Sequence, residues 1–171
     1  PVTPREGILP EINALWFQLL TLAHLWKIKL DRPIPLLKLG TEALSQTNEK
    51  NRPNRVFLHS IPLAPSFVLD ARSSLKEDFE QIQNGLLTPL GLRTLHPCDL
   101  NYHHYYQGDQ TQRDQAYHQG TVWPWLGAHA EMLYSRMINP VNQSHFQLLE
   151  QLAPGKTPIQ GHLPEIADAE T

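Results

Sequence analysis

Fifteen prolines divide this chain of 171 residues into short segments. Because proline has no backbone N–H and its ring clashes with the preceding turn, it ends a helix unless it lies in the first turn. The charged fraction of 18% is low, whereas 40% of the residues are apolar. This combination predicts short helices joined by long ordered loops, and it argues against a disordered chain.

Charge and composition exclude several classes of function. The net charge is −3, and Arg52, Arg55 and Arg93 are isolated, so we expect no nucleic-acid partner. A run of about 18 apolar residues, which a membrane span requires, is absent from the sequence. With a single cysteine, Cys98, an internal disulfide framework and a Cys-based zinc site are excluded, and a reducing, cytoplasmic setting is expected. The first residue, Pro1, is not methionine, so we expect a processed protein or a piece of a longer one.

Apolar residues spaced three and four apart predict several amphipathic helices. We expect these helices over residues 10–30, 66–84, 123–138 and 142–153. In the first helix we expect the buried face to consist of Ile12, Leu15, Trp16, Leu19, Ala23 and Trp26. Gly85 is expected to end the second helix in the left-handed conformation. The third helix has its apolar side at Leu126, Ala130, Leu133 and Met137.

The remaining segments show no regular period. Residues 55–63 hold a short apolar run that fits either a helical turn or an extended segment. Residues 88–121 are rich in Tyr, His, Gln and Asp, and we expect them to form one long loop. Loops of this length inside compact domains are usually functional or disordered, and the aromatic content argues against disorder. No strand pair is predicted, so the expected fold class is all-α.

The junction of this loop with the third helix is the strongest candidate for a binding site. Six aromatic or polar side chains lie within nine residues there: Tyr117, His118, Gln119, Thr121, Trp123 and Trp125. Aromatic faces stack on sugar rings, and His and Gln side chains hydrogen-bond hydroxyl groups. The alternative is that Trp123 and Trp125 belong to the core and that His118 is a hydrogen-bonded structural residue.

Carboxylates at the two ends of the chain are weaker candidates. Glu11 and Asn13 lie on either side of Ile12 at the start of the first helix, where an acid often only compensates the helix dipole. The tail carries Glu165, Asp168 and Glu170. Glycoside hydrolysis uses two carboxyl groups, but a solvated tail is the simpler explanation of these three residues.

A metal site and a catalytic thiol are not expected. The candidate metal ligands are His103, His104, His118 and Asp109. Adjacent histidines point in different directions, and no helical H-x-x-x-H pair accompanies them. Cys98 lies in a loop with nothing nearby in the sequence that would activate its thiol.

Four sequence blocks, in order, resemble the C-terminal glucosidase domain of glycogen debranching enzymes, the amylo-α-1,6-glucosidase type. The blocks are TPREG with EINALW (residues 3–7 and 11–16), RPN (52–54), LTPLGLRTL (87–95) and YQGDQTQRDQAYHQGTVWPWL (106–126). The last block is the most specific, whereas RPN alone would mean little.

The resemblance implies an (α/α)6 barrel and inverting hydrolysis of the α-1,6-linked glucose at a glycogen branch, without metal or cofactor. The family's general base is a Glu near the C-terminus, and the stretch GHLPEIAD at residues 161–168 assigns that role to Glu165. By motif position, the residues that would shape the sugar site are Glu11, Asn13, Arg93, His118, Gln119 and Trp123.

One part of the family pattern is missing. The family's general acid is an Asp in a W-x-D-A stretch before the first block, and this chain contains no such stretch. We therefore expect residues 1–171 to be the C-terminal part of a barrel. The expected partners are glycogen or a branched α-glucan and either the N-terminal part of the domain or a second copy of the chain. The alternatives are a glucan-binding remnant without catalysis and another (α/α)6 sugar hydrolase of the trehalase-like kind.

Overall fold

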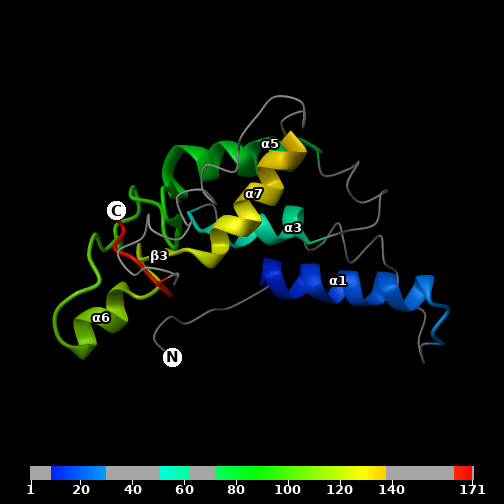
Figure 1. Ribbon diagram of the computed structural model, residues 1–171, viewed down its shortest axis with the longest axis horizontal. Helices are drawn as coiled ribbons and strands as arrows, with labels where there is room; N and C mark the ends of the chain where they lie inside the picture. Colours follow the sequence, from blue (N-terminus) through cyan, green and yellow to red (C-terminus); the bar gives the residue numbers. More distant parts are fainter. Residues whose placement is uncertain (1–8, 30–50, 62–71, 138–163, 171) are drawn as a thin grey trace.

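A computed structural model describes residues 9–29, 51–61, 72–137 and 164–170 (Figure 1). The elements in chain order are α1 (Pro10–Leu25), the 3-10 turn η1 (Pro53–Arg55), α3 (Val56–Ser60), α5 (Arg72–Gln81), the π-helical turn η2 (Ile82–Leu86), β1 (Leu87–Thr88), β2 (Gly91–Arg93), α6 (Gln110–Ala116), β3 (Val122–Trp123) and α7 (Trp125–Met137). The described part of the chain is mostly helical and carries one small sheet.

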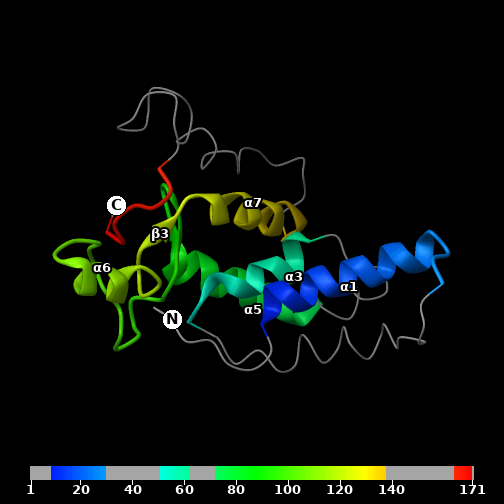
Figure 2. The same cartoon turned by 90° about the horizontal axis from the view of Figure 1, so that it is seen from below.

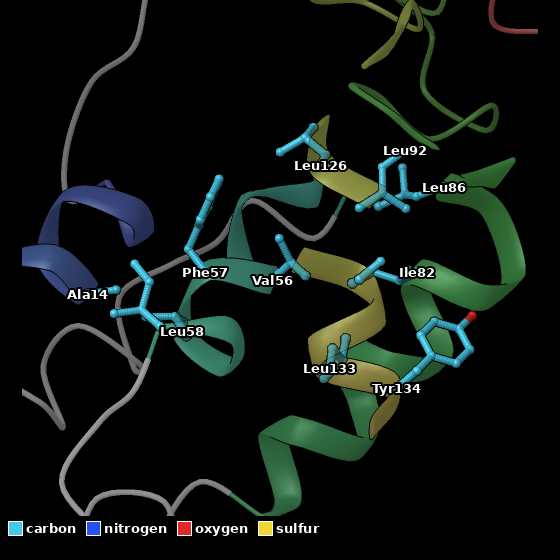
Figure 3. Close-up of a cluster of buried hydrophobic side chains, with 12 residues drawn as sticks. Ala14, Val56, Phe57, Leu58, Ile82, Leu86, Leu92, Leu126, Leu133 and Tyr134 are labelled. Carbon is cyan, nitrogen blue, oxygen red and sulfur yellow. The ribbon is translucent and has the colours of Figure 1, made fainter. Parts of the chain in front are cut away.

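Helices α1, α3, α5 and α7 form what we call the helical body. The short helix α3 packs against both α1 and α7, and α5 packs against α7 (Figures 1 and 2). Residues 53–60 are helical in η1 and α3, so of the two alternatives for residues 55–63 the helical turn is confirmed over 55–60, whereas residues 62 and 63 lie outside the described ranges. The apolar core surrounds α3 and draws on α1, η2, β2 and α7 (Figure 3).

The buried face of α1 differs from the predicted one at every position except Ala23, which is buried as predicted. Ile12, Leu15 and Leu19 are each 56% exposed, whereas the buried face consists of Pro10, Ala14, Phe17, Leu20 and Ala23. Apolar residues lie on both sides of α1, so two stripes at helical spacing exist and the period alone does not choose between them. The side chain of Ala14 belongs to the core cluster around α3, and its small size favours close approach on this face.

Residues 88–121 are not one loop, and the described chain is not all-α. Strands β1, β2 and β3 form an antiparallel sheet in that order, with Leu92 opposite both Leu87 and Trp123. Strands of two or three residues are too short to show an alternating pattern. Gly91 makes the sheet possible, because its φ is 151° and a Cβ there would lie 2.6 Å from the Trp123 carbonyl oxygen.

Helix α6 was also missed, because it forms through its cap and lacks an apolar stripe. Asp109 and Gln112 form a capping box, with the Gln112 N–H donating to Asp109 Oδ1 and the Asp109 N–H donating to Gln112 Oε1, both at 2.9 Å. Of its seven residues only Ala116 is buried. A cap of this kind satisfies the free N–H groups of the first turn and starts a helix locally.

The ends of the other helices also differ from prediction. Gly85 lies within η2 and its φ is not positive, so the predicted left-handed end is wrong. Glycine leaves room for the His96 ring, since a Cβ at this position would lie 1.9 Å from His96 Nε2. In α7 the buried positions Leu126, Ala130 and Leu133 are confirmed, although the helix begins at Trp125 and Trp123 belongs to β3.

Some predictions lie outside the described residues, namely the helix over 142–153, the start of the helix predicted from residue 66, and the side chain of Met137. None of the helices in the described ranges is long and apolar enough to cross a membrane. The barrel itself stays a prediction.

Candidate active site

The tail, residues 164–170, lies along β3. Ala167 and Val122 exchange two backbone hydrogen bonds of 2.9 Å, and the Ala169 N–H donates to the His104 carbonyl oxygen at 3.1 Å. The tail, β3 and α6 therefore share one end of the molecule, away from the far end of α1 (Figures 1 and 2). We call this end, which comprises the sheet, residues 94–121 and the tail, the loop end.

This docking brings Glu165 against the loop–helix junction. The Tyr117 hydroxyl donates to Glu165 Oε1 at 3.1 Å. Burial, together with the hydrogen bond to Glu165 and its negative charge, raises the pKa of Tyr117 above its ordinary value. The phenol is therefore protonated at neutral pH and acts as the donor. The Glu165 side chain is exposed, so water reaches the carboxylate.

Four rings pack together, and we call them the aromatic cluster: Tyr106, Tyr117, His118 and Trp123. His118 stacks on Trp123 with ring centroids 5.3 Å apart and planes 12° apart. Tyr117 meets both rings edge-on, at 4.6 Å from His118 and 4.9 Å from Trp123. The Trp123 indole N–H also donates to the Tyr117 carbonyl oxygen at 3.1 Å. The cluster is therefore an ordered aromatic surface beside the Glu165 carboxylate.

Arg52 fixes the turn that carries the cluster. Its Nη1 donates to the carbonyl oxygens of His118 at 2.7 Å and Thr94 at 3.1 Å, and its Nη2 donates to Gln119 Oε1 at 2.8 Å. Sequence reasoning placed Arg52 in a weak block and assigned it no role. Its partners lie 42 to 67 residues away along the chain, so no local pattern could have revealed them. The amide oxygen of Gln119 is thus already bonded within the protein.

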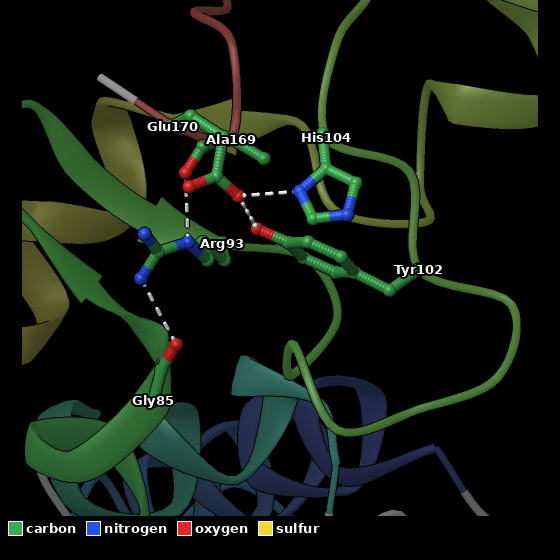
Figure 4. A network of polar contacts seen from close by, with 6 residues as sticks. All are labelled: Gly85, Arg93, Tyr102, His104, Ala169 and Glu170. Atoms are coloured by element: carbon green, nitrogen blue, oxygen red, sulfur yellow. Dashed lines mark hydrogen bonds and ion pairs between the residues drawn. The ribbon is translucent and has the colours of Figure 1, made fainter.

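Arg93, expected at the sugar, ties the tail to η2. Its Nε donates to the Ala169 carbonyl oxygen at 2.8 Å and its Nη1 to the Gly85 carbonyl oxygen at 3.1 Å (Figure 4). Two arms of the guanidinium therefore hold backbone groups of the tail and of η2. This arrangement makes Arg93 a positioning residue for the tail.

The other two tail carboxylates bind the loop. Glu170 Oε1 accepts from the Tyr102 hydroxyl at 2.9 Å and lies 2.9 Å from His104 Nδ1 (Figure 4). The hydrogen bond with His104, and then the one from Tyr102, lower the pKa of Glu170. Burial, and then the hydrogen bond to Glu170, raise the pKa of Tyr102 to about 12. Asp168 Oδ1 accepts from the Tyr106 N–H at 2.8 Å. Both carboxylates anchor the tail from which Glu165 projects.

Glu11 and Asn13 lie on a different element. Both are in the first turns of α1, and the Asn13 amide donates to the Leu9 carbonyl oxygen at 2.8 Å. Ile12 between them is exposed, contrary to prediction. Trp125 is not a core residue either, since it is 51% exposed and its ring contacts Phe57 and His129.

Three of the four candidate metal ligands make other contacts. Asp109 caps α6, His104 bonds Glu170, and His118 stacks on Trp123. Within the described ranges, no three His, Cys, Asp or Glu side chains are grouped so that they could hold a metal ion.

The chain is similar in sequence to known proteins. A family model described as amylo-alpha-1,6-glucosidase matches residues 36–171, a range that includes Arg52, Arg93, the aromatic cluster and the tail. A glycogen debranching enzyme of Saccharomyces cerevisiae (strain ATCC 204508 / S288c) is 34% identical over 65 residues, which is 34% of this chain and 4% of the relative. The chain thus spans only a small part of that relative's length.

Proposed function

The chain belongs to the amylo-alpha-1,6-glucosidase family, and on that premise we propose that it is a glycogen-debranching glycoside hydrolase domain. Its substrate is the α-1,6-linked glucose of a trimmed branch in glycogen or a similar glucan, and the linkage is hydrolysed with inversion at the anomeric carbon. The helices belong to part of an (α/α)6 barrel, and the setting is cytoplasmic. No metal or cofactor takes part.

In this mechanism Glu165 is the general base. Its carboxylate takes a proton from a water molecule, and the resulting hydroxide oxygen bonds to the anomeric carbon as the bond to the glycosidic oxygen breaks. The glycosidic oxygen leaves with a proton from a second carboxyl group and becomes a hydroxyl group of the remaining glucan. The oxygen of the water becomes the anomeric hydroxyl of the released glucose. Inversion requires the two carboxyl groups about 6.5–9.5 Å apart, to leave room for the water. The resemblance assigns the acid to the family stretch that precedes the first matching block.

The contact between Tyr117 and Glu165 is the observation that carries the proposal. It is supported by the docking of the tail on β3, which leaves the Glu165 side chain exposed beside the aromatic cluster. A donated hydrogen bond on Oε1 orients the carboxylate. Oε2 makes no hydrogen bond within the described part of the chain, and it is the oxygen available to a water.

The sugar contacts follow from position. Trp123 and His118 supply the stacked surface, and the Gln119 amide N–H2 group remains for hydroxyl groups of the sugar while its oxygen is held by Arg52. Arg93 acts through the tail, and its contact with the sugar stays a prediction from the resemblance. Glu11 and Asn13 stay predictions from the resemblance.

Glucose release from a limit dextrin tests the proposal, with the chain complemented by the upstream part of a family domain where this is needed. Glu165→Gln should lower the rate by about 10²–10⁴-fold, the usual contribution of general acid–base catalysis. The matched control is Glu77→Gln, the same substitution at an exposed position of α5, which should leave the rate unchanged. A normal rate in Glu165→Gln would remove the proposed base.

The stacked pair of His118 and Trp123 favours a second candidate, a glucan-binding domain without catalysis. That function predicts glucan binding that is lost in His118→Ala and Trp123→Ala but unchanged in Glu165→Gln. It also predicts no hydrolysis under any complementation, and measured hydrolysis would exclude it.

A further inference from the structure

A row of apolar side chains runs along the solvent-exposed side of α1. The side chains of Ile12, Leu15 and Leu19 are each 56% exposed, and that of Trp26, directly after the helix, is 69% exposed. Leu22 lies in the same row and is half-buried. We call these five residues the outer stripe. Scattered apolar residues on a surface are ordinary, but a continuous apolar row marks a surface where another molecule packs.

The spacing of the outer stripe is that of a helix-pairing seam. Its members follow one another at steps of three, four, three and four residues, from Ile12 to Trp26. Apolar residues at these alternating steps occupy the a and d positions of a heptad, which pack into the holes of a facing helix. The C-terminal end of α1 also projects beyond the other described helices (Figures 1 and 2). The occupant that this surface fits is therefore another helix with a matching seam.

The charges at the two ends of α1 indicate how a second helix would lie. Glu11 is in the first turn, and Lys27 and Lys29 follow the last turn with exposed side chains. Residues 12–26 contain no Asp, Glu, Lys or Arg, so α1 is negative at one end and positive at the other. Two antiparallel copies of α1 bring opposite charges together at both ends, whereas parallel copies bring like charges together. The surface is thus complementary to itself, as a two-fold interface requires.

The exposed area of the outer stripe is also of the right order. Together with Trp16 beside it, which is 48% exposed, the stripe offers on the order of 400 Å² of apolar surface per copy. A standard interface buries about 800 Å² on each partner, of which about 56–65% is apolar. We propose that the outer stripe is the contact surface of a homodimer, in which the α1 helices of two copies pair antiparallel across a two-fold axis near Leu19. This inference concerns assembly and does not depend on hydrolysis.

Sedimentation velocity of the full chain at increasing concentration tests the interface. The unmodified chain should pass from monomer to dimer, and Leu19→Glu should raise the Kd of the dimer by about 100-fold, because it buries two like charges opposite each other at the axis. Leu100→Glu is the matched control, since it makes the same substitution at a fully exposed leucine outside α1, and its Kd should equal that of the unmodified chain. Circular dichroism and the melting temperature verify folding.

Charge reversal tests the antiparallel direction without touching the outer stripe. Glu11→Lys alone and the double variant Lys27→Glu/Lys29→Glu should each raise the Kd by about threefold to tenfold, the range for surface ion pairs that occur twice in the dimer. The triple variant, which exchanges the charges of the two ends, should return the Kd toward that of the unmodified chain. These differences should shrink in about 1 M salt, which screens exposed charges. If Leu19→Glu does not fold, these variants decide.

Three results would overturn the homodimer. The first is a monomer at every concentration, and the second is an unchanged Kd in a folded Leu19→Glu variant. The third concerns a different occupant, the upstream part of a family domain. If adding that part replaces the dimer by a one-to-one complex that Leu19→Glu abolishes, the outer stripe belongs to the upstream part and not to a second copy. A triple charge variant that stays as weak as the single reversals would overturn the antiparallel direction.

Discussion

The helical body and the loop end are held together by different forces. In the helical body, Val56 and Leu133 are fully buried in an apolar cluster (Figure 3). At the loop end, Arg52 and Arg93 bond backbone carbonyl groups, and the tail is held by its own carboxylates and by pairing with β3. An apolar core loses stability when a buried side chain is made smaller, whereas hydrogen-bonded loops lose stability when a donor or a charge is removed. The proposed chemistry lies at the loop end, positioned by the rigid helices.

One buried ion cluster is the exception within the helical body. Asp78 of α5 lies 2.5 Å from Arg55 Nε and 2.6 Å from His59 Nε2, and its side chain is only 4% exposed. The cluster joins α5 to the segment η1–α3. Removing one partner of a buried ion pair leaves an uncompensated charge, which costs more than the pair itself contributes.

The largest loss of stability is expected from Asp78→Ala. Arg55 and His59 would then both lose their contact with the buried Asp78 carboxylate, so the free energy of unfolding should fall by about 3–5 kcal/mol. Urea unfolding followed by circular dichroism measures it. A loss below about 1 kcal/mol, the value of a surface pair, would show that apolar packing alone holds α5 to α3.

Leu133→Ala should cost about 2–5 kcal/mol, because it opens a cavity in the core of the helical body. Met132→Ala is the matched control, since Met132 is the exposed neighbour on the same helix and should change stability by less than about 0.5 kcal/mol. Equal losses in the two variants would contradict the assignment of the buried face of α7.

Arg93→Ala sharpens the comparison by separating activity from stability. Without the bonds to Ala169 and Gly85 the tail loses its tie to η2, and a displacement of Glu165 by about 1 Å could lower hydrolysis roughly 10²-fold. The core of the helical body does not contain Arg93, so urea unfolding should change by only about 1–3 kcal/mol, as for a group of lost hydrogen bonds. Full activity in Arg93→Ala would show that the tail does not depend on this tie.

The smallest effect is expected from Glu170→Gln. The contacts with His104 and Tyr102 lower the pKa of Glu170 below its ordinary value of 4.5. The unfolded chain therefore binds a proton first as the pH falls, so the stabilisation is complete above pH 4.5 and is lost on acidification through the folded-state pKa. Because the carboxylate is 39% exposed, we expect less than about 1 kcal/mol. The variant should lose part of the acid dependence of the melting temperature between about pH 6 and 3; an identical dependence would contradict the anchor.

The sequence predicts the helical body better than the loop end, and the reasons are physical. Helix α7 has one apolar stripe, so Leu126, Ala130 and Leu133 were assigned correctly. Helix α1 has two apolar stripes, and only its packing against α3 decides that the stripe with Ala14 is buried and the stripe with Ile12 is exposed. At the loop end, β2 and β3 exist because they pair with each other, and Arg52 acts on partners far along the chain. Such long-range contacts leave no local pattern in the sequence.

The candidate site shows the same division. The sequence singled out Tyr117, Trp123 and Glu165, and the structure places Glu165 on Tyr117 and Tyr117 on Trp123. The sequence could not show that Arg93 binds the backbone of the tail, because no sequence pattern indicates which acceptor an arginine side chain will bond. Tyr102 and Tyr106, which hold Glu170 and Asp168, were missed for the same reason.

Chemical rescue of Glu165→Ala with azide tests the central claim most directly, namely that the docked tail presents the general base at the aromatic cluster. Limit-dextrin turnover should fall by about 10²–10⁴-fold. Azide, which needs no base, should then restore it by bonding to the anomeric carbon as the glycosidic oxygen leaves with the acid's proton, giving β-glucosyl azide. Glucose release by Glu165→Ala at the unmodified rate, without any azide, would contradict the claim.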